Sequence, residues 1–214
     1  MLQRKTVAAL VAEFLGTYIL ASVVLSMAGR THFPYYAAVG AGVTLMVLIL
    51  GIGTASQSHF NPAVTLGMWT VRKIPTSDMI AYLAVQMLAG FTAFRINEYF
   101  LDQLLPNIAK DAWDWQVVLA EALGTMVFTL GIAAAVYKGY EGVQKAVTIG
   151  LSLTAGILMA SLGSNSMLNP AVAVGMHSLS ASYIVGPLLG ALVGINLYAL
   201  LFVDRPAKTK VRSK

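Results

Sequence analysis

Two pairs of short motifs contain the residues that could do chemistry in this chain of 214 residues. The sequence Asn-Pro-Ala occupies positions 61–63 and again 169–171, and a carboxylate within Ala-Glu-x-x-Gly-Thr occurs at Glu13 and again at Glu121. Glu121 follows Glu13 by the same number of residues as Asn169 follows Asn61, and we call this number the repeat offset. Because a given tripeptide occurs by chance at roughly one position in several thousand, two landmarks in register indicate an internal repeat.

Each Asn-Pro pair predicts the start of a short helix, because Asn is a good N-cap and Pro is preferred at the first helical position. Arg72 and Lys73 follow Asn61 after a segment that gives about 15 Å of helix, half the thickness of a bilayer. The second copy starts at Asn169 and is expected to continue through 171–178. We therefore expect two half-helices whose N-termini meet at the centre of a membrane.

The point where the two helix N-termini meet would favour neutral solutes over cations. The loops 56–60 and 163–168 would be non-helical backbone at mid-depth, which is tolerated only when buried in protein or lining a water-filled cavity. Each helix N-terminus carries roughly half a positive charge. A neutral polar solute would meet carbonyl acceptors and the amide donors of Asn61 and Asn169, whereas protons and metal cations would meet an electrostatic barrier.

The composition requires a membrane around these elements. Hydrophobic residues make up 57% and charged residues 11% of the chain, against the roughly 25% charged residues of a globular protein. The mean hydropathy of +0.74 likewise indicates a membrane protein. A soluble enzyme is excluded, and the zero cysteine count excludes disulfide scaffolds, thiolate zinc sites and cysteine nucleophiles.

Six apolar stretches have the length of about 20 residues that a helix needs to cross a bilayer. They are Thr6–Ala28, Tyr36–Ala55, Met79–Phe100, Trp115–Tyr137, Val143–Leu162 and Tyr183–Val203. We expect a single all-α transmembrane domain over residues 1–214, in which the halves 1–106 and 107–214 each hold three crossings. Because three is odd, the second half enters the membrane upside down, as an inverted repeat.

Lysine and arginine predict the orientation through the positive-inside rule. With both termini cytoplasmic, 11 of the 14 basic residues lie inside and three outside. Those outside are Arg30, Arg95 and Lys110; those inside are Arg4, Lys5, Arg72, Lys73, Lys138, Lys145, Arg205, Lys208, Lys210, Arg212 and Lys214. We expect a multi-pass protein of the cell membrane (plasma or inner), whose basic tail contacts anionic lipid rather than nucleic acid.

The repeated motifs, the first within Ser-His-Phe-Asn-Pro-Ala-Val-Thr, resemble those of the aquaporins (major intrinsic proteins) over essentially the whole chain. The resemblance implies six transmembrane helices plus two re-entrant half-helices, a homotetramer with one pore per subunit, and no cofactor or metal. It implies a passive channel for water and small neutral solutes. The residues it places at the pore are Asn61, Pro62, Ala63, Asn169, Pro170 and Ala171, together with His59.

The selectivity filter departs from the family pattern. In the resembling aquaporins an arginine directly follows the second Asn-Pro-Ala, and here that position is Val172. Glycerol-conducting relatives usually have an aspartate next, where this chain has Ala173. Spacing from the motifs puts the remaining filter positions at Ala41, Ile157 and Ser166. We expect a wide, largely apolar and uncharged filter that passes water with glycerol, urea, ammonia or hydrogen peroxide.

Several residues have two interpretations. Glu13 and Glu121 are intramembrane acids, which form proton relays or ion sites, or each braces the re-entrant loop of its own half, as in the resembling proteins. Symmetry favours the brace. Gly186, Gly190 and Gly194 predict close helix packing, while His32 and His177 are expected to be solvated.

Two other functions stay open at this point. An ion-coupled secondary transporter also uses inverted repeats with broken helices, and Glu13 and Glu121 would be its only buried titratable candidates. A gated or non-conducting structural protein of the same fold has some support from the missing arginine, since apolar constrictions can close by dewetting, but the two intact half-helices argue against it. Enzyme activity is not expected, because no nucleophile–base set or phosphate-binding loop occurs.

Overall fold

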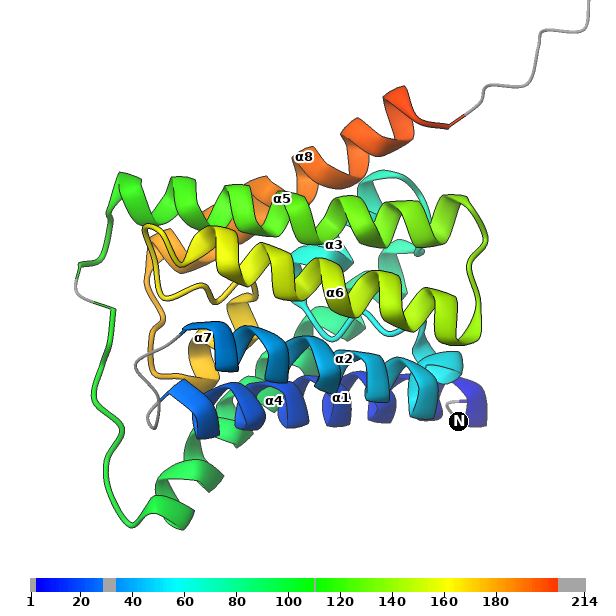
Figure 1. Cartoon of the computed structure of the whole chain (residues 1–214). Coiled ribbons are helices and arrows are strands. Elements are labelled where there is room, and N and C mark those ends of the chain that lie inside the picture. The colour runs from blue at the N-terminus through cyan, green and yellow to red at the C-terminus, as the bar shows by residue number, and fades with distance from the viewer. Residues whose placement is uncertain (1–2, 29–33, 110, 204–214) are drawn as a thin grey trace, which may run out of the picture.

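The computed structural model describes residues 3–28, 34–109 and 111–203. Over this part of the chain it is all-α, with two short helices among longer ones (Figure 1). The helices are α1 (Arg4–Ala28), α2 (Pro34–Ser56), α3 (Pro62–Thr70), α4 (Thr76–Leu101), α5 (Trp115–Tyr137), α6 (Gly142–Ala160), α7 (Pro170–Gly175) and α8 (Ala181–Leu201). Arg30, His32, Lys110 and the basic residues of 205–214 lie outside the described residues.

The six long helices α1, α2, α4, α5, α6 and α8 are long and apolar enough to cross a membrane. Their bounds agree with the six predicted crossings to within three residues, and α5 begins and ends at the predicted positions. Large apolar side chains such as Val47, Leu119 and Leu151 are exposed on the outside of the bundle. Apolar surface of this extent is typical of contact with lipid. The predicted all-α membrane fold is confirmed.

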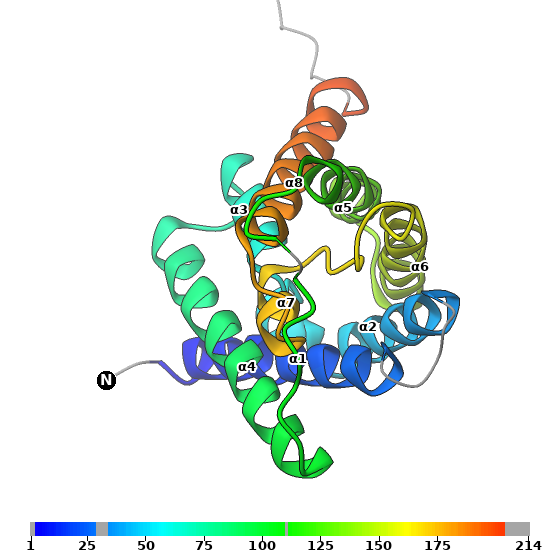
Figure 2. The ribbon, with the colours of Figure 1, turned by 90° about the vertical axis from the view of Figure 1, so that its left-hand side faces the viewer.

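The two halves run in opposite directions. α1 and α5 begin at opposite faces of the bundle, which we name the Arg4 face and the Trp115 face after their first residues (Figure 1). Viewed from the Trp115 face, the long helices form a ring around the short ones (Figure 2). α2 packs against α6 across the two halves. Each half therefore has the order long, long, short, long, and the second half is inverted relative to the first.

The short helices interlock the halves. α3 packs against α8 and α7 packs against α4, so each short helix contacts the last long helix of the other half. Gly90 on α4 makes this approach possible, because a Cβ added there would come within 3.2 Å of Ala171 Cα on α7.

Glycine also brings α5 and α8 together. A Cβ added at Gly186 would lie 2.8 Å from Val118 O, and one added at Gly194 would lie 2.7 Å from Met126 O. Neither contact is tolerable, so the two backbones can approach this closely only with glycine at both positions. The packing predicted from the glycine spacing is confirmed.

Candidate channel site

Asn61 and Asn169 cap the two short helices. The Oδ1 atom of Asn61 accepts a hydrogen bond from Ala63 N (2.8 Å), and that of Asn169 accepts one from Ala171 N (2.9 Å). Pro62 and Pro170 follow at the first helical position. The predicted helix starts are confirmed, because extended backbone at the asparagine leaves its amide oxygen free to cap.

α7 is shorter than expected. It ends at Gly175, whereas the sequence pattern predicts helix through Ser178. His177 adopts a left-handed conformation with φ of 50°, and Ser178 N turns back to bond Ala173 O at 2.8 Å. This turn closes the helix one turn early.

The cap amides also join the halves. Asn61 Nδ2 donates to Leu168 O and Asn169 Nδ2 donates to Phe60 O, both at 2.9 Å. Each asparagine thus caps its own helix and bonds the loop that precedes the other. The sequence predicts that both amide groups donate into a pore; one N–H of each is used in this cross-link instead, which leaves the second.

The loops before the caps have strained backbone. Ser58 and Phe60 have positive φ angles of 62° and 48°, and Ser166 and Leu168 have 56° and 50°. Side chains other than glycine rarely occupy this region, and they persist there only when surrounding contacts hold them. The repeat offset relates Ser58 to Ser166 and Phe60 to Leu168, so the two loops share this conformation at equivalent positions.

The buried carboxylates supply these contacts. Glu13 accepts His59 N on Oε1 (2.9 Å) and Phe60 N on Oε2 (2.6 Å). Glu121 accepts Met167 N on Oε1 (2.9 Å) and Leu168 N on Oε2 (2.7 Å). Both side chains are fully buried. Each carboxylate therefore pairs two loop N–H groups that would otherwise be unsatisfied, as a loop brace requires.

The third partner of each carboxylate differs. Gln86 Nε2 on α4 donates to Glu13 Oε2 at 2.7 Å and also lies 2.9 Å from Thr65 Oγ1. In the second half, Ser164 Oγ donates to Glu121 Oε1 at 2.6 Å. Sequence reasoning missed Gln86; the signal for it was an amide side chain in the middle of an apolar crossing.

His59 lies at the junction of this network. Its Nδ1 atom is 3.1 Å from Thr65 Oγ1, and its ring packs edge-on against Tyr82 with centroids 5.6 Å apart. The ring is buried. It is thus fixed by contacts on two sides, and it also lines the cavity described next.

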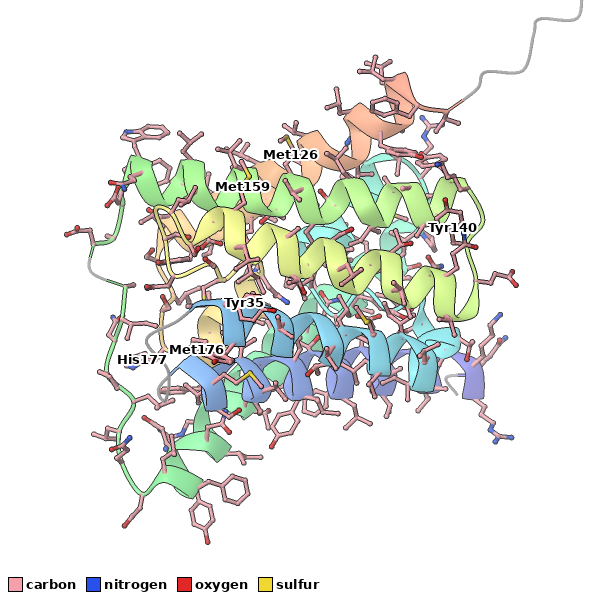
Figure 3. All side chains as sticks on the ribbon, viewed as in Figure 1. Tyr35, Met126, Tyr140, Met159, Met176 and His177 are labelled. Carbon is pink, nitrogen blue, oxygen red and sulfur yellow. The ribbon has the colours of Figure 1, made fainter. Side chains whose placement is uncertain are left out.

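A cavity of about 580 Å³ leads from the Arg4 face to the start of α3. Its deep end includes His59 and Val64, next to the capped helix start. Its outer end includes Tyr140, which lies at the Arg4 face beside the turn between α5 and α6 (Figure 3). Lys145 and Glu141 are the charged residues in its lining. The cavity therefore extends from the Arg4 face to the first turn of α3.

The four expected filter positions come from four segments. Ala41 is on α2, Ile157 on α6, Ser166 in the loop before α7, and Val172 on α7. All four are buried, and Ala41, Ile157 and Val172 belong to the hydrophobic core of the bundle. The Ser166 hydroxyl has no hydrogen-bond partner among the described residues.

His177 is not the solvated side chain that was expected. Its Nδ1 atom lies 2.6 Å from Leu105 O, and its ring is 4.9 Å from that of Phe94. His177 and Met176 lie at the Trp115 face, beyond the end of α7 (Figure 3). Over the described residues, no group of three or more histidine and acidic side chains could hold a metal ion.

Comparison with known proteins agrees with this geometry. Residues 1–202 match the family described as Major intrinsic protein. Aquaporin AqpM of Methanothermobacter marburgensis is 30% identical, over 89% of this chain and 96% of its own length. Aquaporin Z of Photorhabdus laumondii is 26% identical, over 92% and 98%. The solved aquaglyceroporin of Plasmodium falciparum shares the fold, with a TM-score of 0.74 at 18% identity over 92% of this chain and 97% of its own. The chain belongs to the major intrinsic protein family and is a passive membrane channel of the aquaporin type.

Proposed function

We propose that this channel passes water and small neutral solutes such as glycerol along a path through the bundle, past the point where α3 and α7 meet. The observation that carries the proposal is the pair of capped helix N-termini, cross-linked by Asn61 and Asn169, together with a cavity that reaches the first turn of α3. Two positive helix ends repel cations there. The free amide N–H groups and loop carbonyls offer hydrogen bonds to a neutral solute.

We assign Ala41, Ile157, Ser166 and Val172 as the filter near the Trp115 face. An apolar, uncharged set of this kind is wider than one that contains an arginine, and it would hold a solute through the Ser166 hydroxyl. Similarity to proteins named aquaporin Z and aquaglyceroporin supports water and glycerol as test solutes. We further propose a homotetramer with both termini in the cytoplasm, so that the Arg4 face is cytoplasmic.

Ion-coupled transport is less well supported than a passive pore. Such a mechanism needs titratable groups along the path. The carboxylates of Glu13 and Glu121 are fully buried and engaged by loop donors, and neither lines the cavity. We assign them a bracing role instead.

Osmotic measurements on proteoliposomes test the proposal. With sucrose outside, vesicles that contain the protein should shrink faster than empty vesicles; with glycerol outside, they should shrink and then re-swell. Rapid shrinkage without re-swelling would restrict the channel to water. No flux above empty vesicles from intact oligomers would overturn the proposal in favour of a gated or structural role. Crosslinking of the purified protein should yield tetramers.

Val172→Arg tests the filter assignment directly. A guanidinium at this position should narrow the path and occupy the Ser166 hydroxyl, so glycerol flux should fall by about tenfold, equivalent to about 1.4 kcal/mol in the barrier, while water flux falls less. The measurement is the ratio of glycerol to water flux in the same vesicles. An unchanged ratio in a folded variant would refute the assignment.

A further inference from the structure

The repeat offset relates the assigned filter to a second set of side chains. The positions equivalent to Ala41, Ile157, Ser166 and Val172 in the other half are Ile149, Ile49, Ser58 and Val64, in that order. All four of these residues line the cavity that opens at the Arg4 face. The inverted repeat therefore places an equivalent set on the other side of the midplane.

The two sets match in chemistry and burial. Three of the four positions hold the same residue type, and the exposed fractions agree pairwise. Val64 and Val172 are 1% and 2% exposed, Ser58 and Ser166 are 7% and 8%, and Ile49 and Ile157 are 6% and 7%. The sets are thus close copies, presented to the path by equivalent elements of the two halves.

The serine pair gives an independent sign of function. Ser58 and Ser166 are both held at positive φ, and the N–H of each bonds a serine hydroxyl two residues earlier, Ser56 or Ser164. Their own hydroxyls are buried and have no partner among the described residues. A buried hydroxyl without a partner is costly, and Ser58 lines the cavity, so its hydroxyl is free to bond water or a passing solute.

The sets differ at one position. Ala41 in the filter corresponds to Ile149 on α6, which is 4% exposed. Isoleucine is the larger side chain by three carbon atoms, and its branched Cβ stiffens it. At otherwise equivalent positions, the set near the Arg4 face therefore has the bulkier side chain.

We propose that Ile49, Ser58, Val64 and Ile149 form a second filter, and that Ile149 makes it the size-limiting one. This inference rests on the proposed function. A solute crosses the two filters in series. Each filter is an apolar ring of side chains with one serine hydroxyl, and the narrower ring determines the size of the largest molecule that passes. Lys145, one helical turn before Ile149 on α6, places a positive charge at the entrance to this ring.

Exchanging the two differing residues tests the inference. Ile149→Ala should raise glycerol flux several-fold relative to water, because both rings then match the wider one. Ala41→Ile should reduce glycerol flux only to about half, since it adds a second equal resistance in series. The double variant A41I/I149A transposes the narrow ring and should return the ratio to that of the unaltered protein.

Controls separate folding from selectivity. Leu151→Ala removes an exposed side chain from the same helix and should leave the ratio unchanged, while Ile149→Val retains most of the packing and should give a smaller rise than alanine. An unchanged ratio in Ile149→Ala, with a large fall in Ala41→Ile, would overturn the inference and leave the channel function standing. Absence of water flux in the unaltered protein would overturn the channel function, and the inference with it.

Discussion

Glu13 and Glu121 each accept two N–H groups of a re-entrant loop, but their third hydrogen-bond partners differ. Glu13 bonds two loop N–H groups at 2.9 and 2.6 Å, and Glu121 bonds two at 2.9 and 2.7 Å. Beyond this shared pair of bonds the halves diverge, with Gln86 from another helix on one side and Ser164 from the loop itself on the other.

The reason for the difference lies in the neighbouring helices. The residue of α8 that lies against Glu121 is Gly186, where an added Cβ would come 2.6 Å from Glu121 Cβ. The position equivalent to Thr65 is Ala173. The second half therefore lacks both the amide and the hydroxyl of the first-half network. What the halves share is the pair of carboxylate bonds to the loop N–H groups.

The largest expected effect comes from removing a carboxylate. In Glu13→Gln or Glu121→Gln, the new NH2 group must face one of two loop N–H donors, since each donor bonds a different oxygen. A buried donor left unpaired should lower the free energy of unfolding by about 3 kcal/mol at either site. The measurement is the thermal unfolding midpoint in detergent.

Glu141→Gln, at an exposed position near the Arg4 face, is the matched control and should have no effect. Equal losses in the two halves would support one bracing role for both carboxylates. A variant of normal stability but altered ion flux would instead favour a relay.

A smaller effect is expected from the cross-links between the halves. Asn61→Asp or Asn169→Asp retains a capping oxygen but loses the donor to the opposite loop carbonyl. We expect a loss of about 1–2 kcal/mol. The added negative charge at the two helix ends should also increase cation leak.

Unfolding midpoints and potassium conductance of the vesicles measure these two effects. Asn107→Asp is the control, because Asn107 also accepts a backbone N–H with its side chain but lies in an exposed loop. If only one of the two variants is destabilised, the halves do not depend on each other equally.

The smallest effect should appear where the halves differ. Gln86→Leu removes the donor to Glu13 and Thr65 yet leaves both backbone bonds of the brace, so we expect a loss of about 1.5 kcal/mol. Ser164→Ala removes the hydroxyl that donates to Glu121 and accepts the Ser166 N–H, so we expect a loss of about 1.5 kcal/mol here as well.

The double variant of these two residues sharpens the comparison. With separate partners in separate halves, the two losses should add within about 0.5 kcal/mol. A clear departure from additivity, measured by the same unfolding midpoints, would mean that the two loops fold as one unit.

Much of the local structure could be predicted from sequence. The six crossings followed from length and hydropathy, and the starts of α3 and α7 followed from Asn-Pro pairs, because capping depends on a few adjacent residues. The early end of α7 could not be predicted, because it depends on a turn at His177, whose ring packs against Phe94 and whose Nδ1 contacts Leu105.

By itself, the sequence determined the number of crossings, the repeat offset and the positions of the helix caps. The tertiary structure alone decided that Asn61 bonds Leu168 and Asn169 bonds Phe60, pairs separated by 107 and 109 residues. It also decided that Ile49, Ser58, Val64 and Ile149 line one cavity. Local patterns act through neighbouring residues, whereas contacts between halves exist only after the helices have packed and two chain segments meet with opposite directions.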